Sequence, residues 1–287
     1  MRKTLLGISA LAALAVANTA HAEDGDGWQI HGFGDISVKS DYVTPRGLVV
    51  VDDGATIQVL NGLVVAAPSG VAIHAGTWLD LNPGYNRAEN ITAVNEFDWF
   101  VGIDAPIAKG LTAGVEYSEF ISGQPSVAFK PERNIEFSLK YADGGPDSKV
   151  TINPYAKFFW AVDSKSSTVV LGKRGGTFDV ELGAVPTVKL GGGSISAPTW
   201  VTVGPKTYWG AKDNALAVEG QNFGVFSTGL KGMAPLTMFK GGAKASVYAQ
   251  LQYYHLINDN LVTARRLLTN STGRDKLVFA AGINFGF

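Results

Sequence analysis

The sequence predicts an all-β protein, a transmembrane antiparallel up-and-down β-barrel of about 12 strands. Three observations lead to this prediction: apolar and polar side chains alternate with a period of two along most of the chain, short turns alternate with long loops, and the last alternating segment ends on Phe287. Beyond the N-terminal segment, no stretch approaches the roughly 18 apolar residues that a spanning helix needs. A large soluble β protein is the alternative.

The N-terminal segment has the three parts of a secretory signal. Two basic residues follow Met1, then comes the apolar run "LLGISALAALAVA", and "AHA" at 20–22 has the small-x-small form of a cleavage site. The apolar run is too short to cross about 30 Å of hydrocarbon as a helix, which argues against a membrane anchor. We therefore expect residues 1–22 to be removed and residues 23–287 to form a single barrel domain.

The composition excludes several classes of function. The chain has no cysteine, so disulfides, thiolate metal sites and a thiol nucleophile are ruled out. Removing Arg2 and Lys3 with the signal leaves 22 of the 24 basic residues against 25 acidic ones, and this balance predicts no nucleic-acid partner. The lysine-glycine segments at 172–176 and 204–207 lack the spacing of a phosphate-binding loop. No cofactor is expected.

Each predicted strand carries one apolar and one polar face. In "NEFDWFVGIDA" at 95–105, Phe97, Trp99 and Val101 fall on one side, and Glu96 and Asp98 fall on the other. A helix would scatter both sets, whereas a strand separates them. Twelve segments follow this pattern, and the number is even, as bacterial barrels require. They are residues 28–43, 55–67, 70–81, 95–106, 110–121, 134–142, 149–161, 176–189, 198–209, 221–231, 242–257 and 275–287.

The connections between these segments alternate in length. Short turns rich in glycine and proline are predicted at 67–70, 106–110, 143–149, 190–198 and 232–242. Longer loops are predicted at 44–55, 82–94, 122–133, 163–176, 209–220 and 258–274. Short periplasmic turns, long extracellular loops and two periplasmic termini are typical of a barrel in the outer membrane of a Gram-negative bacterium.

The alternation also predicts which side chains face the interior. Hydrocarbon cannot form hydrogen bonds, so the outer face must be apolar, whereas the interior can be polar and wet. The charged residues expected to line the interior are Asp35, Lys39, Asp80, Glu96, Asp98, Glu116, Glu136, Lys140, Lys157, Asp179, Glu181 and Lys244. The aromatic residues expected in girdles at the membrane interfaces are Trp28, Trp78, Trp99, Trp160, Tyr208 and Trp209.

A series of short motifs in the first half of the chain resembles a known family. "SDYVTPRG" at 40–47 is followed by "HAGTW", "NEFDWFVG", "GLTAGVEY" and "NIEFSLKYAD". Their order resembles the S-D-Y, R-G, A-G-x-W, E-x-D, G-L-T and E-x-x-L-x-Y series of the TorF family of porins, over about residues 36–142. Thr44-Pro45 stands where the family has an aromatic residue, and the Ser-Gln that follows the family's glycine is missing. The resemblance implies an outer-membrane barrel that acts as a channel.

An outer-membrane enzyme is a weaker hypothesis. A barrel phospholipase needs a serine nucleophile beside a histidine base, but none of His31, His74 and His255 stands in a His-x-Ser arrangement. We expect their rings to lie in water. Carboxylates two residues apart, such as Asp179 and Glu181, fit an acidic interior wall better than a glycosidase pair or a cation site. Neither catalytic residues nor metal ligands are expected.

The predicted interior carries more acids than lysines, which favours a narrow channel for small hydrophilic solutes with a weak preference for cations. The pairs Lys173-Arg174 and Arg265-Arg266 fall in outer loops, where they would meet lipopolysaccharide phosphates or water. A second hypothesis is a non-conducting structural or surface-interaction barrel, plugged by inward loops, with its function in loop 258–274. A monomer is slightly favoured over a trimer.

The C-terminal segment is expected to close the barrel. It places Phe287, Phe285 and Ile283 on the lipid side and Asn284 on the interior side, and it would pair with the first strand. A terminal aromatic on such a strand also resembles the signal by which outer-membrane barrels are recognised by the barrel-assembly machinery. We therefore predict Phe287 to be an assembly signal.

Overall fold

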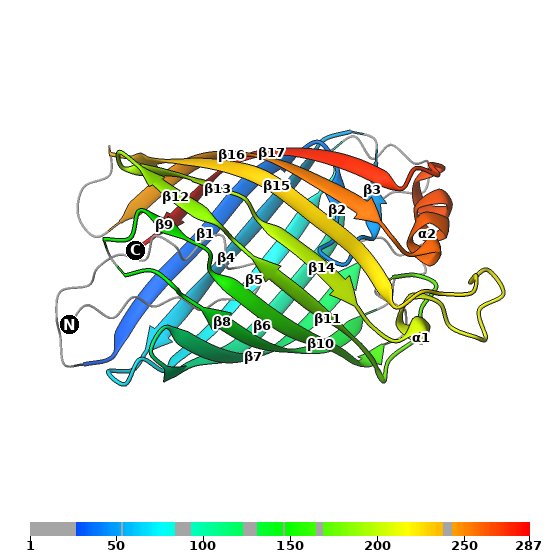
Figure 1. Cartoon of the computed structure of the whole chain (residues 1–287), viewed down its shortest axis with the longest axis horizontal. Coiled ribbons are helices and arrows are strands. Elements are labelled where there is room, and N and C mark those ends of the chain that lie inside the picture. The colour runs from blue at the N-terminus through cyan, green and yellow to red at the C-terminus, as the bar shows by residue number, and fades with distance from the viewer. Residues whose placement is uncertain are drawn as a thin grey trace.

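The protein is a closed barrel of twelve antiparallel strands (Figure 1). The computed structural model describes residues 27–52, 54–83, 93–122, 131–145, 147–164, 169–237 and 243–287. The wall strands are β1 (Gln29–Lys39), β4 (Thr56–Ala66), β5 (Ala72–Leu81), β6 (Val94–Ala108), β7 (Leu111–Ser122), β8 (Glu132–Tyr141), β10 (Pro154–Ser164), β11 (Thr177–Ala184), β14 (Thr199–Val203), β15 (Phe223–Leu236), β16 (Lys244–Leu256) and β17 (Asp275–Gly286). The predicted all-β barrel is therefore confirmed, and the predicted signal at 1–22 lies outside the described residues.

Each wall strand pairs with its neighbours in the chain, and β14 pairs with β15 in this way. The pairing of β1 with β17 closes the sheet. Three short strands, β9 (Val150–Thr151), β12 (Thr187–Leu190) and β13 (Gly193–Ser196), extend β10, β11 and β14 toward the end of the barrel. Pro186 and Pro198 lie in two of these breaks and Pro154 begins β10 after the third, and proline lacks the N–H that a continuous ladder would need.

Two predicted turns and one predicted strand had the wrong bounds. The segment 190–198 contains β13, and the segment 232–242 contains the last five residues of β15. The strand predicted at 198–209 instead ends at Val203, because Pro205 follows it and caps a short helix, α1 (Lys206–Trp209). Tyr208 and Trp209 therefore belong to a helical turn, and their side chains pack in the barrel's interior.

The two ends of the barrel differ as predicted. Tight turns and the C-terminus lie at one end, on the left in Figure 1. The long connections lie at the other end, where they form α1, a second helix α2 (Asp259–Thr269) and a small sheet of β2 (Tyr42–Val43) and β3 (Val49–Val51). Neither helix in the described part of the chain is long and apolar enough to cross a bilayer.

The outer surface of the barrel is apolar, as the alternation requires. Exposed and inward positions follow one another along every long strand, as in the pattern of β6, where Phe97, Val101 and Ile103 are exposed and Glu96 and Asp98 are buried. Other exposed apolar side chains on the strands are Ile30, Ile36, Val38, Leu63, Ile73, Val115, Phe137, Leu139, Phe178, Leu182, Leu251, Leu277, Phe279 and Ile283. Such a surface is suited to hydrocarbon.

Three of the predicted girdle residues were wrongly placed. Trp78 faces the interior and is 4% exposed, while Tyr208 and Trp209 are buried with the interior face of several strands. Tyr208 and Trp209 follow the end of β14 in sequence, but their segment folds back into the barrel. Trp28 and Trp160 are exposed on the outside.

The seam between β1 and β17 depends on glycine facing phenylalanine. Gly32 and Phe287 exchange two backbone hydrogen bonds of 2.9 and 3.1 Å, and Gly34 is opposite Phe285. A Cβ added to Gly32 would lie 2.2 Å from the Phe287 ring, and one added to Gly34 would lie 2.3 Å from the Phe285 ring. The rings therefore lie flat over the two glycines, an arrangement known to stabilise glycine in sheets.

This seam yields a first prediction. Gly34→Val should lower the free energy of unfolding by about 1–3 kcal/mol, because the new side chain overlaps the Phe285 ring. Urea unfolding in lipid vesicles, followed by tryptophan fluorescence, measures the change. Adding Phe285→Ala should restore much of the loss, whereas Ala249→Val, on the exposed face of β16, should be nearly neutral. Wild-type stability of Gly34→Val would contradict this account of the seam.

Candidate functional site

The barrel interior is the candidate functional site, and most predicted interior residues lie there. Eleven of the twelve occupy inward positions on their strands: Asp35, Lys39, Asp80, Glu96, Asp98, Glu116, Glu136, Lys140, Lys157, Asp179 and Glu181. Lys244 has the matching parity on β16 but is exposed, because it begins the strand at the turn end of the barrel. Lys231, which was not predicted, also faces inward, with its Nζ 3.9 Å from the centroid of the Tyr248 ring.

The interior is less polar than predicted over one part of the wall. Inward positions of β1, β4, β5 and β6 carry a buried apolar cluster that includes Phe33, Leu60, Val64, Trp78 and Phe100. These side chains interrupt the period-two pattern of polar residues. Where apolar residues stand on both faces of a strand, the sequence shows no alternation that would reveal which face is inward. Apolar and charged side chains therefore share the inward faces of β1, β5 and β6.

The first long loop folds into the barrel as a small hairpin. It consists of β2, a turn at Thr44-Pro45-Arg46-Gly47, and β3, and we refer to residues 42–51 as the inward hairpin. The Gly47 N–H donates to the Thr44 carbonyl over 2.9 Å, and Thr44 Oγ1 accepts from the Leu48 N–H over 3.1 Å. Proline at the second position and glycine at the fourth suit this turn, and Gly47 has φ +87°, which disfavours other residues.

The inward hairpin reaches opposite walls of the barrel. The Tyr42 hydroxyl donates to Glu96 on β6 over 2.8 Å, while a Cβ on Gly47 would lie 2.8 Å from Val225 on β15. In the circular strand order, β6 and β15 are six strands apart in either direction. Val43 and Val49 are buried among side chains of β10, β16 and β17. The hairpin thus spans the interior from side to side at this level.

Arg46 occupies the tip of the hairpin and is held by three groups. Its Nε lies 3.1 Å from Asp179 Oδ1, its Nη2 lies 3.9 Å from Glu136 Oε2, and its guanidinium stacks 3.3 Å from the centroid of the Phe159 ring. These partners come from β11, β8 and β10. Glu136 is shared with Lys157, whose Nζ is 3.3 Å away. A planar guanidinium between carboxylates and a ring face has little freedom to move.

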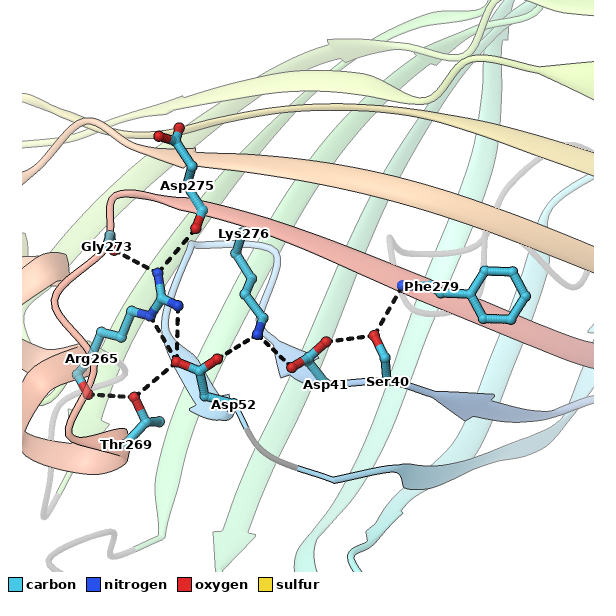
Figure 2. A network of polar contacts seen from close by, with 9 residues as sticks. All are labelled: Ser40, Asp41, Asp52, Arg265, Thr269, Gly273, Asp275, Lys276 and Phe279. Carbon is cyan, nitrogen blue, oxygen red and sulfur yellow. Dashed lines mark hydrogen bonds and ion pairs between the residues drawn. The ribbon is translucent and has the colours of Figure 1, made fainter.

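A second group of charges fixes the base of the hairpin (Figure 2). Lys276 on β17 lies 2.6 Å from Asp41 Oδ1 and also contacts Asp52, so one ammonium joins the two ends of the hairpin. Arg265 on α2 donates to Asp52 over 2.9 Å, and Thr269 donates to the same carboxylate. We refer to Asp41, Asp52, Arg265 and Lys276 as the base cluster.

The base cluster corrects the prediction for Arg265. The sequence placed it in an outer loop facing lipopolysaccharide or water, but its side chain is 6% exposed and also donates to the carbonyls of Gly273 and Asp275. Partial burial raises the pKa of Asp52, yet hydrogen bonds from Lys276 and Arg265 outweigh this effect and hold it below its usual range. Arg265 therefore fastens α2 to the inward hairpin, while the neighbouring Arg266 is exposed.

The motifs that resemble the TorF series meet around the hairpin. Tyr42 of the S-D-Y motif lies with its ring centroid 5.4 Å from that of Trp78 in the A-G-x-W motif, and its hydroxyl reaches Glu96 of the E-x-D motif. Arg46 of the R-G motif pairs with Glu136 of the E-x-x-L-x-Y motif. Residues separated by up to about ninety positions in sequence therefore form one contact network.

His74 was expected to have its ring in water, and that prediction was wrong. The ring is 3% exposed and lies between two carboxylates, with Nδ1 3.2 Å from Asp104 and Nε2 3.1 Å from Glu116. Lys140 Nζ lies 3.6 Å from Asp104. No local pattern predicts this contact, because the three residues come from β5, β6 and β7 and the register of these strands brings them together.

An acidic group on β5 and β6 is satisfied mainly by neutral donors. Asp80 accepts hydrogen bonds from Thr56, Gln58 and Asn95, and Glu96 accepts from Tyr42. Within the described residues, no group of three or more histidine, aspartate or glutamate side chains has the arrangement to hold a metal ion. The interior thus offers charge to a passing solute but no built metal site in this part of the chain.

The base cluster yields a second prediction. Lys276→Gln should raise the rate of hydrogen exchange at the Thr44 and Gly47 amides by at least about tenfold, or about 1.4 kcal/mol in local opening, because hydrogen bonds to charged groups contribute about 1.5–3 kcal/mol each. Exchange in the wall strands should not change, since their ladders stay intact. Lys173→Gln, at an exposed position of the same end, is the control. Unchanged exchange in the hairpin would show that Lys276 does not hold it.

Comparison with known proteins places the fold among outer-membrane barrels. No family model and no characterised protein sequence matches the chain, so the TorF resemblance stays a prediction. An outer-membrane channel from Pseudomonas putida F1 superposes with a TM-score of 0.50 and 10% identity, over 93% of this chain and 100% of that one. The NanC porin gives a TM-score of 0.48 and 9% identity, over 88% and 98%. At such identities the likeness to the Pseudomonas channel shows a shared barrel fold alone.

Proposed function

We propose that the protein is a porin-like channel in the outer membrane of a Gram-negative bacterium, through which small hydrophilic solutes diffuse. The observation that carries this proposal is the sidedness of the closed barrel, which is apolar outside and charged inside. A closed, dry protein core would not carry so many ionisable side chains, because burying charge without water is costly. The family resemblance and the fold of the Pseudomonas channel support the same conclusion.

The proposed location defines the partners. The apolar outer belt would contact membrane lipid, and the exposed Lys173 and Arg174 at the loop end would meet lipopolysaccharide phosphates. The tight turns and both termini would then be periplasmic. The barrel-assembly machinery would insert the chain by recognising the terminal strand.

A weak preference for cations follows from the charges of the wall. On inward positions the carboxylates outnumber the lysines, and the group around Asp80, Glu96 and Asp98 has no lysine or arginine within ion-pair distance among the described residues. A negative potential in a narrow low-dielectric space raises the local concentration of cations. The effect is small because Lys140, Lys157 and Arg46 compensate much of the remaining charge.

The third prediction tests the channel directly. Purified, folded protein in a planar bilayer should give discrete conductance steps, and a salt gradient should give a reversal potential of the sign expected for cation preference. Silence of the wild type over the whole voltage range would reject the channel. A reversal potential of the opposite sign would reject the cation preference alone. The denatured protein added to the same bilayer is the control for leakage.

A second candidate function is a non-conducting barrel that acts through its outer loops. The inward hairpin and the buried side chains at the loop end, among them Leu171, Tyr208 and Leu261, favour this candidate because they fill the interior. It differs from the channel in that the wild-type protein would remain silent in bilayers. The charged wall on the far side of the hairpin from α2 favours the channel, since it would serve no purpose in a permanently sealed barrel.

The fourth prediction concerns assembly. Deleting Phe287 should reduce the folded fraction in the outer membrane, because it removes both hydrogen bonds to Gly32 and the ring that covers it. Heat-modifiable migration on a gel measures the folded fraction. Phe287→Ala keeps the backbone and separates the effect of the ring, and Phe279→Ala, also exposed on β17, controls for loss of any aromatic. Normal assembly of the deletion variant would contradict the proposed role.

A further inference from the structure

We infer that Arg46 at the tip of the inward hairpin determines the conductance and the ion selectivity of the channel. This inference rests on the proposed function and deepens it by naming the group that a permeating ion must pass. The Arg46 guanidinium ties the hairpin that crosses the interior to two carboxylates of the wall, those of Asp179 and Glu136. The argument has three steps: the position of the hairpin, the charges around its tip, and the rigidity of the guanidinium.

The hairpin lies across any path through the barrel. Its contacts with β6 and β15 join strands that face each other. Its tip pairs with Glu136 on β8, and its base pairs with Lys276 on β17, which is likewise six strands away from β8 in either direction. The contacts that join β6 to β15 and those that join β8 to β17 therefore both run through residues 41–52. Any ion that traverses the interior must pass beside this segment or displace it.

The tip places one positive charge against a negative wall. Arg46 faces Asp179 and Glu136, and Glu181 lies two residues beyond Asp179 on the same face of β11. Lys157 is the other cation of this group, and it pairs with Glu136. A guanidinium stays charged in proteins, so the narrow space beside the tip holds nearly balanced charges. Removing the arginine leaves an excess of carboxylates, which attracts cations and repels anions.

The guanidinium is fixed rather than mobile. It stacks on Phe159 at 3.3 Å, and the preceding residue, Pro45, accepts a 3.0 Å hydrogen bond from the Trp200 indole on its carbonyl. The Thr44 to Gly47 turn holds the backbone on either side. Because both the side chain and the backbone are anchored to the wall, the tip narrows the interior permanently instead of transiently. Its size and charge should therefore appear in every conductance event.

The fifth prediction compares Arg46→Ala, Arg46→Lys and wild type in planar bilayers with a salt gradient. Arg46→Ala should raise single-channel conductance severalfold and shift the reversal potential toward stronger cation selectivity. Arg46→Lys should keep the selectivity near that of wild type, since the charge remains, but raise conductance because the stacked, forked contact is lost. Arg174→Ala, an exposed arginine at the same end, removes the same charge and should change neither quantity. Folding of each variant is checked by heat-modifiable migration.

A second measurement keeps the test independent of the arginine's contribution to folding. The chain has no cysteine, so Thr44→Cys provides a single thiol beside the tip, with sulfur in place of the hydroxyl oxygen that accepts from the Leu48 N–H. Positively and negatively charged thiol reagents added to an open channel should reduce conductance and shift the reversal potential in opposite directions. Ser69→Cys, in an exposed turn at the far end, is the control and should respond to neither reagent.

The outcomes separate this inference from the proposed function. A conducting wild type with Arg46→Ala and Thr44→Cys responses equal to their controls would overturn the role of Arg46 and leave the channel standing. A silent wild type that conducts after Arg46→Ala would overturn the channel as the function of the wild type and support Arg46 as the residue that closes the interior. Silence of wild type and Arg46→Ala alike would overturn the channel and the inference together.

Discussion

Closure of the sheet is the constraint on which the rest of the structure depends. A strand exposed to hydrocarbon cannot leave its backbone N–H and C=O groups unpaired, and only a closed barrel removes both edges. The β1–β17 seam meets this need with a full antiparallel register between Phe33 and Lys39 of one strand and Ala280 and Gly286 of the other. Once the sheet is closed, every side chain points either to the outside or to the interior, and the alternation of apolar and charged residues follows from that division.

A closed barrel of twelve strands also creates an interior that must be filled or hydrated. Part of the wall is filled by apolar side chains on β1, β4, β5 and β6, and the loop end is filled by α1 and the aromatic residues around it. The remaining inward positions carry charges, and most of them meet an opposite charge or a neutral donor. His74 between Asp104 and Glu116 is one such compensated group. Compensation keeps the cost of burial low while preserving a surface that can interact with ions.

The inward hairpin ties these two regions together. Its base joins α2 to β17 through Asp52 and Lys276, and its tip joins the acidic wall through Arg46. The hairpin has few contacts between its own two strands, so its position depends on the wall around it. Stability of the barrel and access through it are for that reason coupled: the same ion pairs that hold the loop inward also occupy the space through which a solute would pass.

The sequence by itself determined the fold class, the approximate positions of the twelve strands, the alternation of short and long connections, and which face of each strand points outward. These properties are local, because strand periodicity and turn chemistry are written in a few consecutive residues. It also placed eleven of twelve charged residues on the interior face, because parity along a strand settles which way a side chain points.

Tertiary structure alone decided which inward residues meet. Arg265 and Tyr208 lie in segments that look like outer loop and strand end, yet Arg265 is buried against Asp52 at the base of the hairpin and Tyr208 packs into the interior. Arg46 pairs with Asp179, which is 133 residues away, and such a contact depends on the register around the whole barrel. The sequence predicted residues 44–55 as one long outer loop, and nothing local indicates that this segment points inward. A loop enters a barrel instead of covering it when the closed sheet places side chains on the opposite walls that can bind the loop.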